Sequence, residues 1–254
     1  MHLILTGATG LVGSAVLDAM LKTADVTKIS IISRRPVKMA EDGKDPRINV
    51  IIHKNFEDYG PDLLSKVDGA TGCVWALGIS QTEVEKEEYV QITKTMTLRA
   101  AEAFQKLSHP TQPFNFVYVS GEGATHDPGR FTPIFGRVKG ETEIALSEMR
   151  KANANFHAST IRPAFVDLAS HDAIKEYVPR LGAFRYGLLT VLGPGIRCFL
   201  KGSWSPTEHM GRFMVEMALG KWDSQLVGPG VEKLGDLPIV NNTAFRRLAG
   251  LDKA

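Results

Sequence analysis

The chain contains 254 residues, which is enough for one large α/β domain and does not require a second one. Charged residues make up 23% and hydrophobic residues 43% of the chain, as is typical of soluble globular proteins. The formal net charge of +2 is close to neutral and argues against nucleic acid as a partner.

Apolar strand-like segments alternate with amphipathic helical segments along most of the chain. The first strand, at 3–6, is followed by a helix over 11–22, and a longer helical run covers 89–107. The other expected strands are 28–33, 48–53, 72–77, 114–120 and 157–166. This alternation predicts an α/β fold of the Rossmann type, a doubly wound parallel sheet with helices on both faces. We assign 1–167 to this core and expect 168–254 to form a small, irregular, mainly helical C-terminal cap on the same domain.

The turn between the first strand and the first helix is rich in glycine. It reads TGATGLVG, with Gly7, Gly10 and Gly13 three residues apart. Glycine lets the backbone pass close to a pyrophosphate, and the following helix offers free N–H groups and its positive dipole end to the phosphates. A glycine-rich turn without a ligand is the alternative. Because the motif follows a strand and opens a helix, we expect it to bind a dinucleotide.

The second strand ends in a basic turn. At the place where NAD-binding proteins usually carry a carboxylate for the ribose 2′-hydroxyl, this chain has Ser33, Arg34 and Arg35. The planar guanidinium of arginine suits the 2′-phosphate of NADP, which a carboxylate would repel. The pattern favours NADPH as the cofactor, and a solvated basic turn is the alternative.

Seven short blocks occur in an order that resembles the short-chain dehydrogenase/reductase superfamily, in its atypical or extended branch. The blocks are LTGATGLVG (5–13), ISRRP (32–36), NFED (55–58), ALG (76–78), VSGEGA (119–124), VKGETE (138–143) and RPAFV (162–166). Within the superfamily, the chain looks most like the NAD(P)H-binding proteins related to the Tat-interacting protein and their fungal relatives. The resemblance covers residues 1–167 and implies a Rossmann fold that binds NADPH.

The resemblance also implies which residues contact the cofactor. Those at the pyrophosphate would be Gly7, Thr9, Gly10, Leu11 and Val12, and those at the 2′-phosphate Arg34 and Arg35. The adenine would contact Asn55 and Phe56. The ribose would contact Ala76, Leu77 and Gly78. The nicotinamide amide would contact Pro163, Ala164, Phe165 and Val166. Asn55 stands where the family has an acidic residue, and an asparagine can still form a hydrogen bond there.

The catalytic group implied by the resemblance is incomplete. Ser120 matches the serine that closes the fifth strand, and Lys139 matches the lysine that binds the nicotinamide ribose. In the superfamily a tyrosine four residues before this lysine donates a proton, and the lysine lowers the pKa of that tyrosine. Here the position is Phe135, which has no proton to give. A reductase built on this pattern therefore needs another proton donor.

The loop GEGATHDPG (121–129) offers one candidate donor. It follows the fifth strand, at the carboxyl edge of the expected sheet where ligands bind, and it carries Glu122, His126 and Asp127. A histidine can donate a proton near neutral pH, so we name His126 as a candidate acid. A solvated loop histidine is the alternative. No metal site is expected.

The sequence after residue 167 is less regular. Segment 177–204 combines apolar residues with four basic ones, namely Arg180, Arg185, Arg197 and Lys201. It could form a lid over an apolar substrate, a contact with a membrane surface or with a second copy of the chain, or a helical cap with solvated arginines.

A further helix is expected near 205–220. Its start, Ser205-Pro206-Thr207-Glu208, has a serine as N-cap, a proline in the first turn and a glutamate three residues after the serine. The pattern predicts that the Ser205 side chain accepts a hydrogen bond from a backbone N–H of the first turn.

Neither a targeting segment nor a membrane span is expected. An apolar strand follows Met1 and His2 directly, and no stretch reaches the ~18 apolar residues of a span. We expect a cytoplasmic protein, and a peripheral position on an intracellular membrane, such as the mitochondrial outer membrane, is the alternative. Cys73 and Cys198 are too few for a disulfide scaffold and have apolar neighbours, which indicates buried thiols.

These features predict an NADPH-dependent oxidoreductase that acts on an apolar carbonyl or quinone-like small molecule, with a homodimer as one arrangement it could adopt. Two alternatives stay open. One is an NADPH-binding regulator or redox sensor without catalytic activity, which would act through a protein partner. The other is a lyase or isomerase on the same fold. Steady turnover of NADPH would favour the oxidoreductase, whereas tight binding without turnover would favour the regulator.

Overall fold

The computed structural model describes residues 1–109, 111–178 and 201–252, and within them eight strands form one sheet. In spatial order the strands are β3 (Ile48–Ile52), β2 (Lys28–Ser33), β1 (His2–Thr6), β4 (Gly72–Trp75), β5 (Phe114–Val119), β6 (Phe156–Arg162), β10 (Leu237–Asn241) and β9 (Val231–Leu234). Neighbouring strands are parallel except for β9, which runs antiparallel to β10 at one edge. The order reverses between β1 and β4, which confirms the doubly wound Rossmann-type fold.

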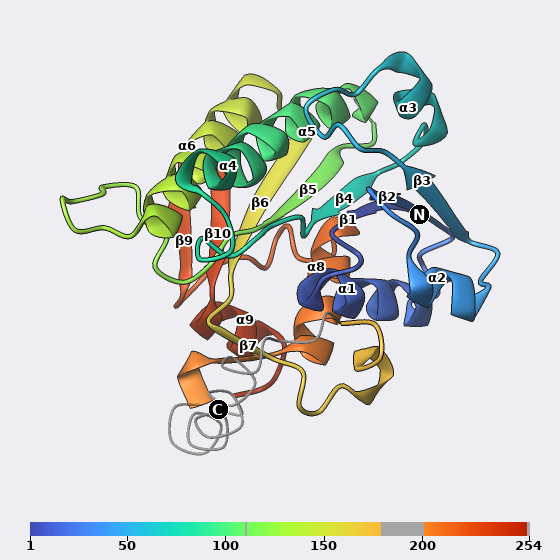
Figure 1. Ribbon diagram of the computed structural model, residues 1–254. Coiled ribbons are helices and arrows are strands. Elements are labelled where there is room, and N and C mark those ends of the chain that lie inside the picture. Colours follow the sequence, from blue (N-terminus) through green and yellow to red (C-terminus); the bar gives the residue numbers. More distant parts are fainter. Residues whose placement is uncertain (110, 179–200, 253–254) are drawn as a thin grey trace.

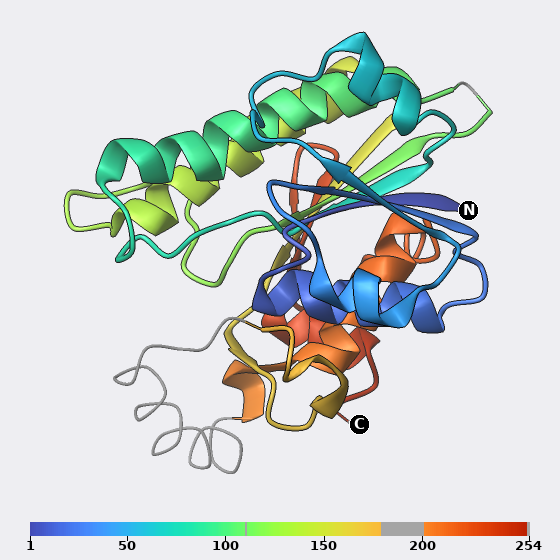
Figure 2. The same cartoon turned by 45° about the vertical axis from the view of Figure 1, so that its right-hand side comes forward.

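Helices cover both faces of this sheet (Figures 1 and 2). One face carries α1 (Leu11–Lys22) and α8 (Thr207–Ala218), and the other carries α4 (Lys86–Val90), α5 (Met96–Phe104) and α6 (Ile134–Ala152). A π-helical turn over Gln91–Thr95 joins α4 to α5, so the predicted helical run is continuous. The shorter helices are α2 (Lys38–Gly43), α3 (Pro61–Lys66) and α9 (Asn242–Leu248).

Apolar residues lie on both faces of the central strands because both faces are covered. On β1, Leu3 and Leu5 join the cluster under α1 and α8, and Ile4 between them joins the cluster under α5 and α6. All five residues of β1 are buried, as expected for a parallel sheet enclosed by helices. Cys73 on β4 is also buried, as predicted, whereas Cys198 lies outside the described residues.

Helix α8 packs closely on α1. A Cβ atom added to Gly211 would lie 2.4 Å from the carbonyl oxygen of Ala15, so only glycine allows this approach. Beside the contact, His171 Nε2 lies 2.9 Å from Asp18 Oδ2 on α1, and its Nδ1 lies 3.1 Å from Thr207 Oγ1 on α8. These buried side chains join the C-terminal part of the chain to the first helix.

The predicted sixth strand, 157–166, is divided in the structure. Strand β6 ends at Arg162, and Pro163, which has no N–H to donate to a sheet ladder, follows it. The chain then leaves the main sheet as β7 (Phe165–Asp167), which pairs in parallel with β8 (Trp204–Pro206) in a separate two-stranded sheet. This turn brings the segment after β6 toward the carboxyl ends of the neighbouring strands.

The capping role predicted for Ser205 is wrong. Helix α8 begins at Thr207 and has no side-chain cap, because Ser205 belongs to the extended strand β8. The buried Ser205 hydroxyl instead accepts a hydrogen bond from the backbone N–H of Ala164 at 3.0 Å. It donates one to Asn242 Oδ1 at 2.6 Å.

The region after residue 167 does more than cap the domain. Its strands β10 and β9, which the sequence analysis did not predict, continue the main sheet beyond β6. Most of segment 177–204 lies outside the described residues. Within the residues that the structure describes, no helix is long and apolar enough to cross a membrane.

Candidate active site

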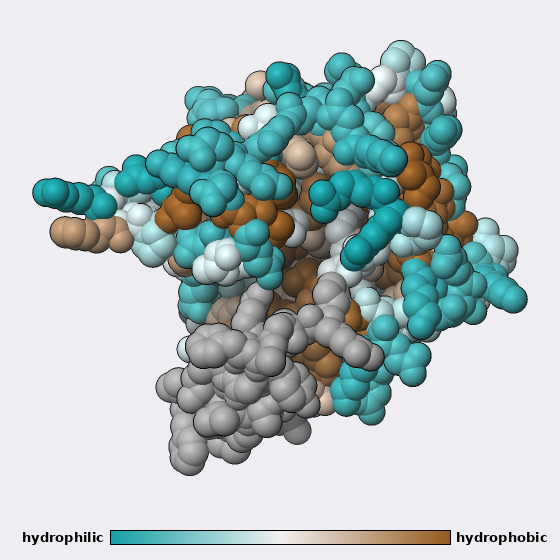
Figure 3. All heavy atoms as spheres, viewed as in Figure 1, coloured by the Kyte–Doolittle hydropathy of each residue, from teal (hydrophilic) through white to brown (hydrophobic). Residues whose placement is uncertain are grey.

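A cavity of about 690 Å³ lies at the carboxyl ends of β1, β4 and β5. The surface is hollowed on this face of the molecule (Figure 3). Most of the predicted site residues meet in its wall, and they are Gly10, Leu11, Val12, Ala76, Leu77, Gly78, Ser120, Phe135, Lys139, Pro163, Ala164 and Val166. The cavity lies where the strand order reverses, which is where open α/β sheets bind their ligands.

The glycine turn forms one end of this cavity. Gly7 has a φ of +71°, and a Cβ atom there would lie 2.3 Å from the carbonyl oxygen of Ala76. A Cβ atom on Gly13 would lie 2.0 Å from the carbonyl oxygen of Gly7. The turn, the helix and the segment after β4 thus pack without room for side chains. The N–H groups of Leu11 and Val12, in the first turn of α1, have no partners within the helix and can face a phosphate.

A second cavity, of about 370 Å³, adjoins the glycine turn. Its wall includes Thr9, Arg34, Arg35 and the ring of Phe56, and Leu77 lines both cavities. Arg34 and Arg35 are exposed, and neither forms an ion pair with any other described residue. Two cations therefore lie beside an open cavity at the end of β2.

At the other end of the larger cavity, Lys139 meets the end of β5. Its Nζ donates a hydrogen bond of 2.5 Å to the backbone oxygen of Ser120. Burial lowers the pKa of Lys139 to about 8, although the carboxylate of Glu143, one helical turn further on, acts in the opposite direction. The hydroxyl of Ser120 is buried and has no hydrogen-bond partner in the part of the chain that the structure describes. The cavity wall thus brings together a half-buried cation and a hydroxyl that has no partner among the described residues.

Phe135 also lines the cavity, with its ring against the loop that follows β5. A Cβ atom added to Gly123 would lie 3.1 Å from Cζ of this ring. The backbone N–H of Phe135 donates to Oε1 of Gln81 at 3.0 Å. Gln81 lies in the segment after β4 and lines the cavity as well, so its side chain joins two walls of the cavity.

Three predicted residues are not part of the cavity walls. His126 instead lies 2.7 Å from Glu143 Oε2 and 3.1 Å from Arg162 Nη2, and it does not line the cavity. Phe165 is the first residue of β7, and the two residues on either side of it line the cavity instead. Asn55 is exposed, and its Oδ1 accepts a hydrogen bond from the N–H of Glu57.

No protein-family model matches the chain. Among curated proteins, it is 38% identical over 238 residues to the "Leucinostatins biosynthesis cluster protein T" of Purpureocillium lilacinum, with 86% of this chain and 85% of that protein covered. It is 47% identical over 157 residues to the "Botcinic acid biosynthesis cluster B protein 16" of Botryotinia fuckeliana, with 61% and 99% covered.

Solved structures with the same fold include two short-chain dehydrogenase/reductases. The one from Burkholderia thailandensis has a TM-score of 0.68 at 12% identity, with 98% of this chain and 93% of that chain covered. The one from Mycobacterium ulcerans has a TM-score of 0.66 at 15% identity, with 96% and 89% covered. The chain belongs to one family with the Purpureocillium protein, and it has the fold of the short-chain dehydrogenase/reductases.

The superfamily fold also supports chemistry other than reduction. A dTDP-glucose 4,6-dehydratase from Streptomyces venezuelae, solved with NAD bound, has a TM-score of 0.64 at 16% identity, with 99% of this chain and 80% of that chain covered. At this level of identity the comparison shows the fold alone. The reaction of this chain must therefore be argued from its own side chains.

The structure adds cavity residues that the sequence analysis did not single out. Tyr89 on α4 is almost fully buried in the wall, and burial raises the pKa of its phenol. Glu122, which the sequence analysis noted in the loop after the fifth strand, lines the exposed rim. The sequence offered little signal for Tyr89, because it stands at the start of the predicted helical run with no motif around it. Within the described residues, no group of three or more His, Cys, Asp or Glu side chains could hold a metal ion.

Proposed function

We propose that the chain is an NADPH-dependent oxidoreductase that reduces an apolar carbonyl or quinone-like small molecule. The observation that carries the proposal is that Arg34 and Arg35, the glycine turn, Lys139 and Ser120 follow one another along two adjoining cavities. NADPH would supply a hydride when bound. The remaining chemistry belongs to the side chains of this chain.

The shape of the first cavity and the charges beside the second support a bound dinucleotide. The turn from Gly7 to Gly13 has no room for side chains and exposes backbone N–H groups, as a pyrophosphate requires. Arg34 and Arg35 would bind the 2′-phosphate, and Phe56 would pack beside the adenine. Lys139 would hold the nicotinamide ribose at the far end.

At the substrate end of the cavity, the Ser120 hydroxyl is a donor without a partner among the described residues. The hydroxyl is also buried, an arrangement that costs on the order of 1–3 kcal/mol until a ligand satisfies it. A substrate carbonyl oxygen could accept this hydrogen bond. Because Phe135 cannot donate a proton, we propose Tyr89 as the donor. It is a buried side chain of the cavity wall, and its phenol carries a proton that it could donate.

The names of the relatives support a small-molecule substrate. Both curated relatives are named for biosynthesis clusters, one for botcinic acid and one for leucinostatins. We infer that this chain also modifies an intermediate in the synthesis of a small organic product, and we place it in the cytoplasm. Fractionation tests the location, because a protein that pellets with membranes and is released by carbonate would contradict it.

NADPH oxidation in the presence of a panel of quinones and diketones tests the activity. The native protein should oxidise NADPH slowly but steadily with at least one of them. The Gly13→Val variant should not, because its side chain would collide with the backbone of Gly7 and block the pyrophosphate site. Equal rates in the two proteins would contradict the proposal.

A regulator without catalytic activity is the second candidate, and Phe135 is the observation that favours it. An apolar ring at the position of the superfamily's proton donor preserves the cofactor site but removes the usual chemistry. Such a protein would bind NADPH tightly and would turn over none of the carbonyl compounds. Tight binding with no turnover in the assay above would therefore select the regulator.

A further inference from the structure

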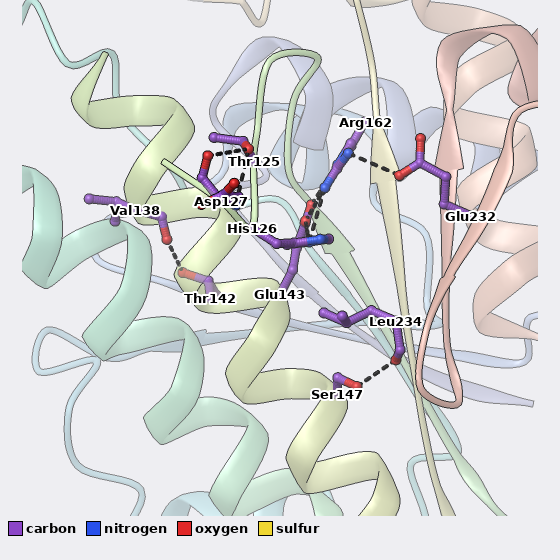
Figure 4. Close-up of polar contacts among 10 residues, drawn as sticks. All are labelled: Thr125, His126, Asp127, Val138, Thr142, Glu143, Ser147, Arg162, Glu232 and Leu234. Carbon is purple, nitrogen blue, oxygen red and sulfur yellow. Dashed lines mark hydrogen bonds and ion pairs between the residues drawn. The ribbon is translucent and has the colours of Figure 1, made fainter. Parts of the chain in front are cut away.

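A buried ionic cluster lies behind the cavity, and we propose that Glu143 and Arg162 act in it as positioning residues that set the charge of Lys139. The inference rests on the proposed function in one respect, since Lys139 matters through the cofactor that it would hold. The cluster itself consists of contacts between side chains of α6, β6, β9 and the loop after β5 (Figure 4).

Glu143 lies at the centre of this cluster and is fully buried. Arg162 on β6 donates two hydrogen bonds to its carboxylate, from Nε to Oε1 at 3.0 Å and from Nη2 to Oε2 at 2.5 Å. His126 approaches the same Oε2 at 2.7 Å from the loop. Glu232 on β9 accepts a hydrogen bond of 3.4 Å from Nη1 of Arg162, at the outer end of the cluster.

Lys139 and Glu143 lie on one side of α6, because residues four apart on a helix are neighbours. Lys139 has its direct hydrogen bond to the backbone oxygen of Ser120, and no carboxylate among the described residues forms an ion pair with it. The negative charge of Glu143 favours the ammonium form of Lys139. Tyr118 on β5 also faces Glu143, but its phenol stays neutral because burial raises its pKa.

The two partners should act on Lys139 in opposite directions. The carboxylate of Glu143 attracts the Lys139 proton, so the pKa of Lys139 should fall when that charge is removed. The guanidinium of Arg162 neutralises part of the same carboxylate. The pKa of Lys139 should therefore rise when Arg162 loses its charge. A cluster that only supports the fold would give shifts of one sign, or none.

The experiment measures the titration of Lys139 in the protein without cofactor. Limiting acetic anhydride would be applied across a pH series, and acetylation of Lys139 would be followed by peptide mass spectrometry. In Glu143→Gln the midpoint should move down by about one pH unit, as expected for charges one helical turn apart. In Arg162→Gln it should move up by a similar amount.

Matched variants separate charge from structure. Glu141→Gln removes another carboxylate of α6. Glu141 lies outside the cluster and forms an ion pair with Lys94, with 2.8 Å between Nζ and Oε2. This variant should leave the acetylation midpoint of Lys139 unchanged. Arg162→Lys keeps the positive charge and should stay near the native midpoint. The inference is overturned if Glu143→Gln and Arg162→Gln shift the midpoint in the same direction or not at all. It is also overturned if Glu141→Gln shifts it as much as Glu143→Gln does.

The cofactor enters through a second measurement on the same proteins. NADPH affinity should fall on the alkaline side of the pH range, and the midpoint of this fall should move with the acetylation midpoint. If NADPH does not bind at all, the proposed function fails, while opposite shifts of the acetylation midpoint would still support the charge assignment. If NADPH binds but its pH dependence does not move, the positioning role is overturned.

Discussion

Lys139 of α6 donates a hydrogen bond of 2.5 Å to the backbone oxygen of Ser120, the residue that follows β5. The contact joins α6 to the end of β5, although 19 residues separate the two residues in the chain. Lys139, Ser120 and Phe135 thus line one cavity, at the positions that the sequence resemblance assigns to a lysine, a serine and a tyrosine. The predictions below concern what these residues can still do.

Cofactor choice should depend on the two arginines that follow β2. We expect NADPH to bind about tenfold or more tightly than NADH, because each charge-assisted hydrogen bond to the 2′-phosphate contributes ~1.5–3 kcal/mol. The Arg34→Ala, Arg35→Ala double variant should lose this preference and keep its affinity for NADH. Fluorescence titration measures both affinities. Equal affinities in the native protein would contradict the prediction.

Restoring the missing phenol should increase reduction. Phe135→Tyr adds a hydroxyl to a cavity wall that already contains Lys139 and Ser120. Since a positioned general acid contributes about 10²–10⁴ in rate, NADPH-dependent reduction of a generic quinone or diketone should rise at least about tenfold. The affinity for NADPH should change little. Replacing Lys139 in this variant should remove the gain, and an unchanged rate with intact cofactor binding would contradict the prediction.

If Tyr89 donates the proton in the native protein, Tyr89→Phe should lower the rate by about 10²-fold and leave NADPH affinity nearly unchanged. Tyr59→Phe is the matched control, because Tyr59 is also a largely buried phenol but does not line the cavity. The comparison is a steady-state rate with the best substrate of the panel. A similar loss in both variants would point to packing in place of proton transfer.

The ionisation of Lys139 should be visible in cofactor binding. Burial lowers its pKa to about 8, so its ammonium loses the proton as the pH rises through that value. NADPH affinity should fall over the same range, and Lys139→Met should bind NADPH more weakly without this dependence. Titrations from pH 6 to 10 at constant ionic strength test the prediction.

The same shift fixes the sign of an effect on stability. Between about pH 8 and 10.5 the unfolded chain holds a proton on this lysine that the folded protein has released. The contribution of Lys139 to the free energy of unfolding should therefore rise with pH in this window. Urea unfolding of the native protein and of Lys139→Met, compared across the window, would isolate the contribution.

The buried contact between His171 and Asp18 should matter for stability. His171→Ala removes one partner of the buried Asp18 carboxylate and of the Thr207 hydroxyl, which should cost about 1–3 kcal/mol. His157→Ala is the control, because His157 pairs with the exposed Asp223, and such surface pairs contribute ~0–1 kcal/mol. Urea unfolding curves give both values. Equal losses in the free energy of unfolding would show that the buried contact stabilises the protein no more than the surface pair does.

Local sequence patterns were enough for the elements that build the cofactor end. The helix predicted over 11–22 is α1 with the same bounds, and the strand predicted over 28–33 is β2 with the same bounds. Both segments are rich in apolar residues and are almost wholly buried. Gly7 and Gly13 mark the places where the turn after β1 approaches the segment after β4 and the first helix. Such information lies within a few neighbouring residues, and it can be read without knowing the fold.

Contacts between distant segments could not be read in this way. The residues around Ser205 predict that its hydroxyl caps a helix. In the structure this hydroxyl accepts a hydrogen bond from the N–H of Ala164, which lies 41 residues earlier, because strand β8 pairs with β7. The sequence around His126 suggested a free loop acid, yet its side chain contacts Glu143 of α6 and Arg162 of β6 and does not line the cavity. A polar group bonds to whichever partner the fold brings within about 3 Å, and that partner depends on strand pairing and helix packing across the whole domain.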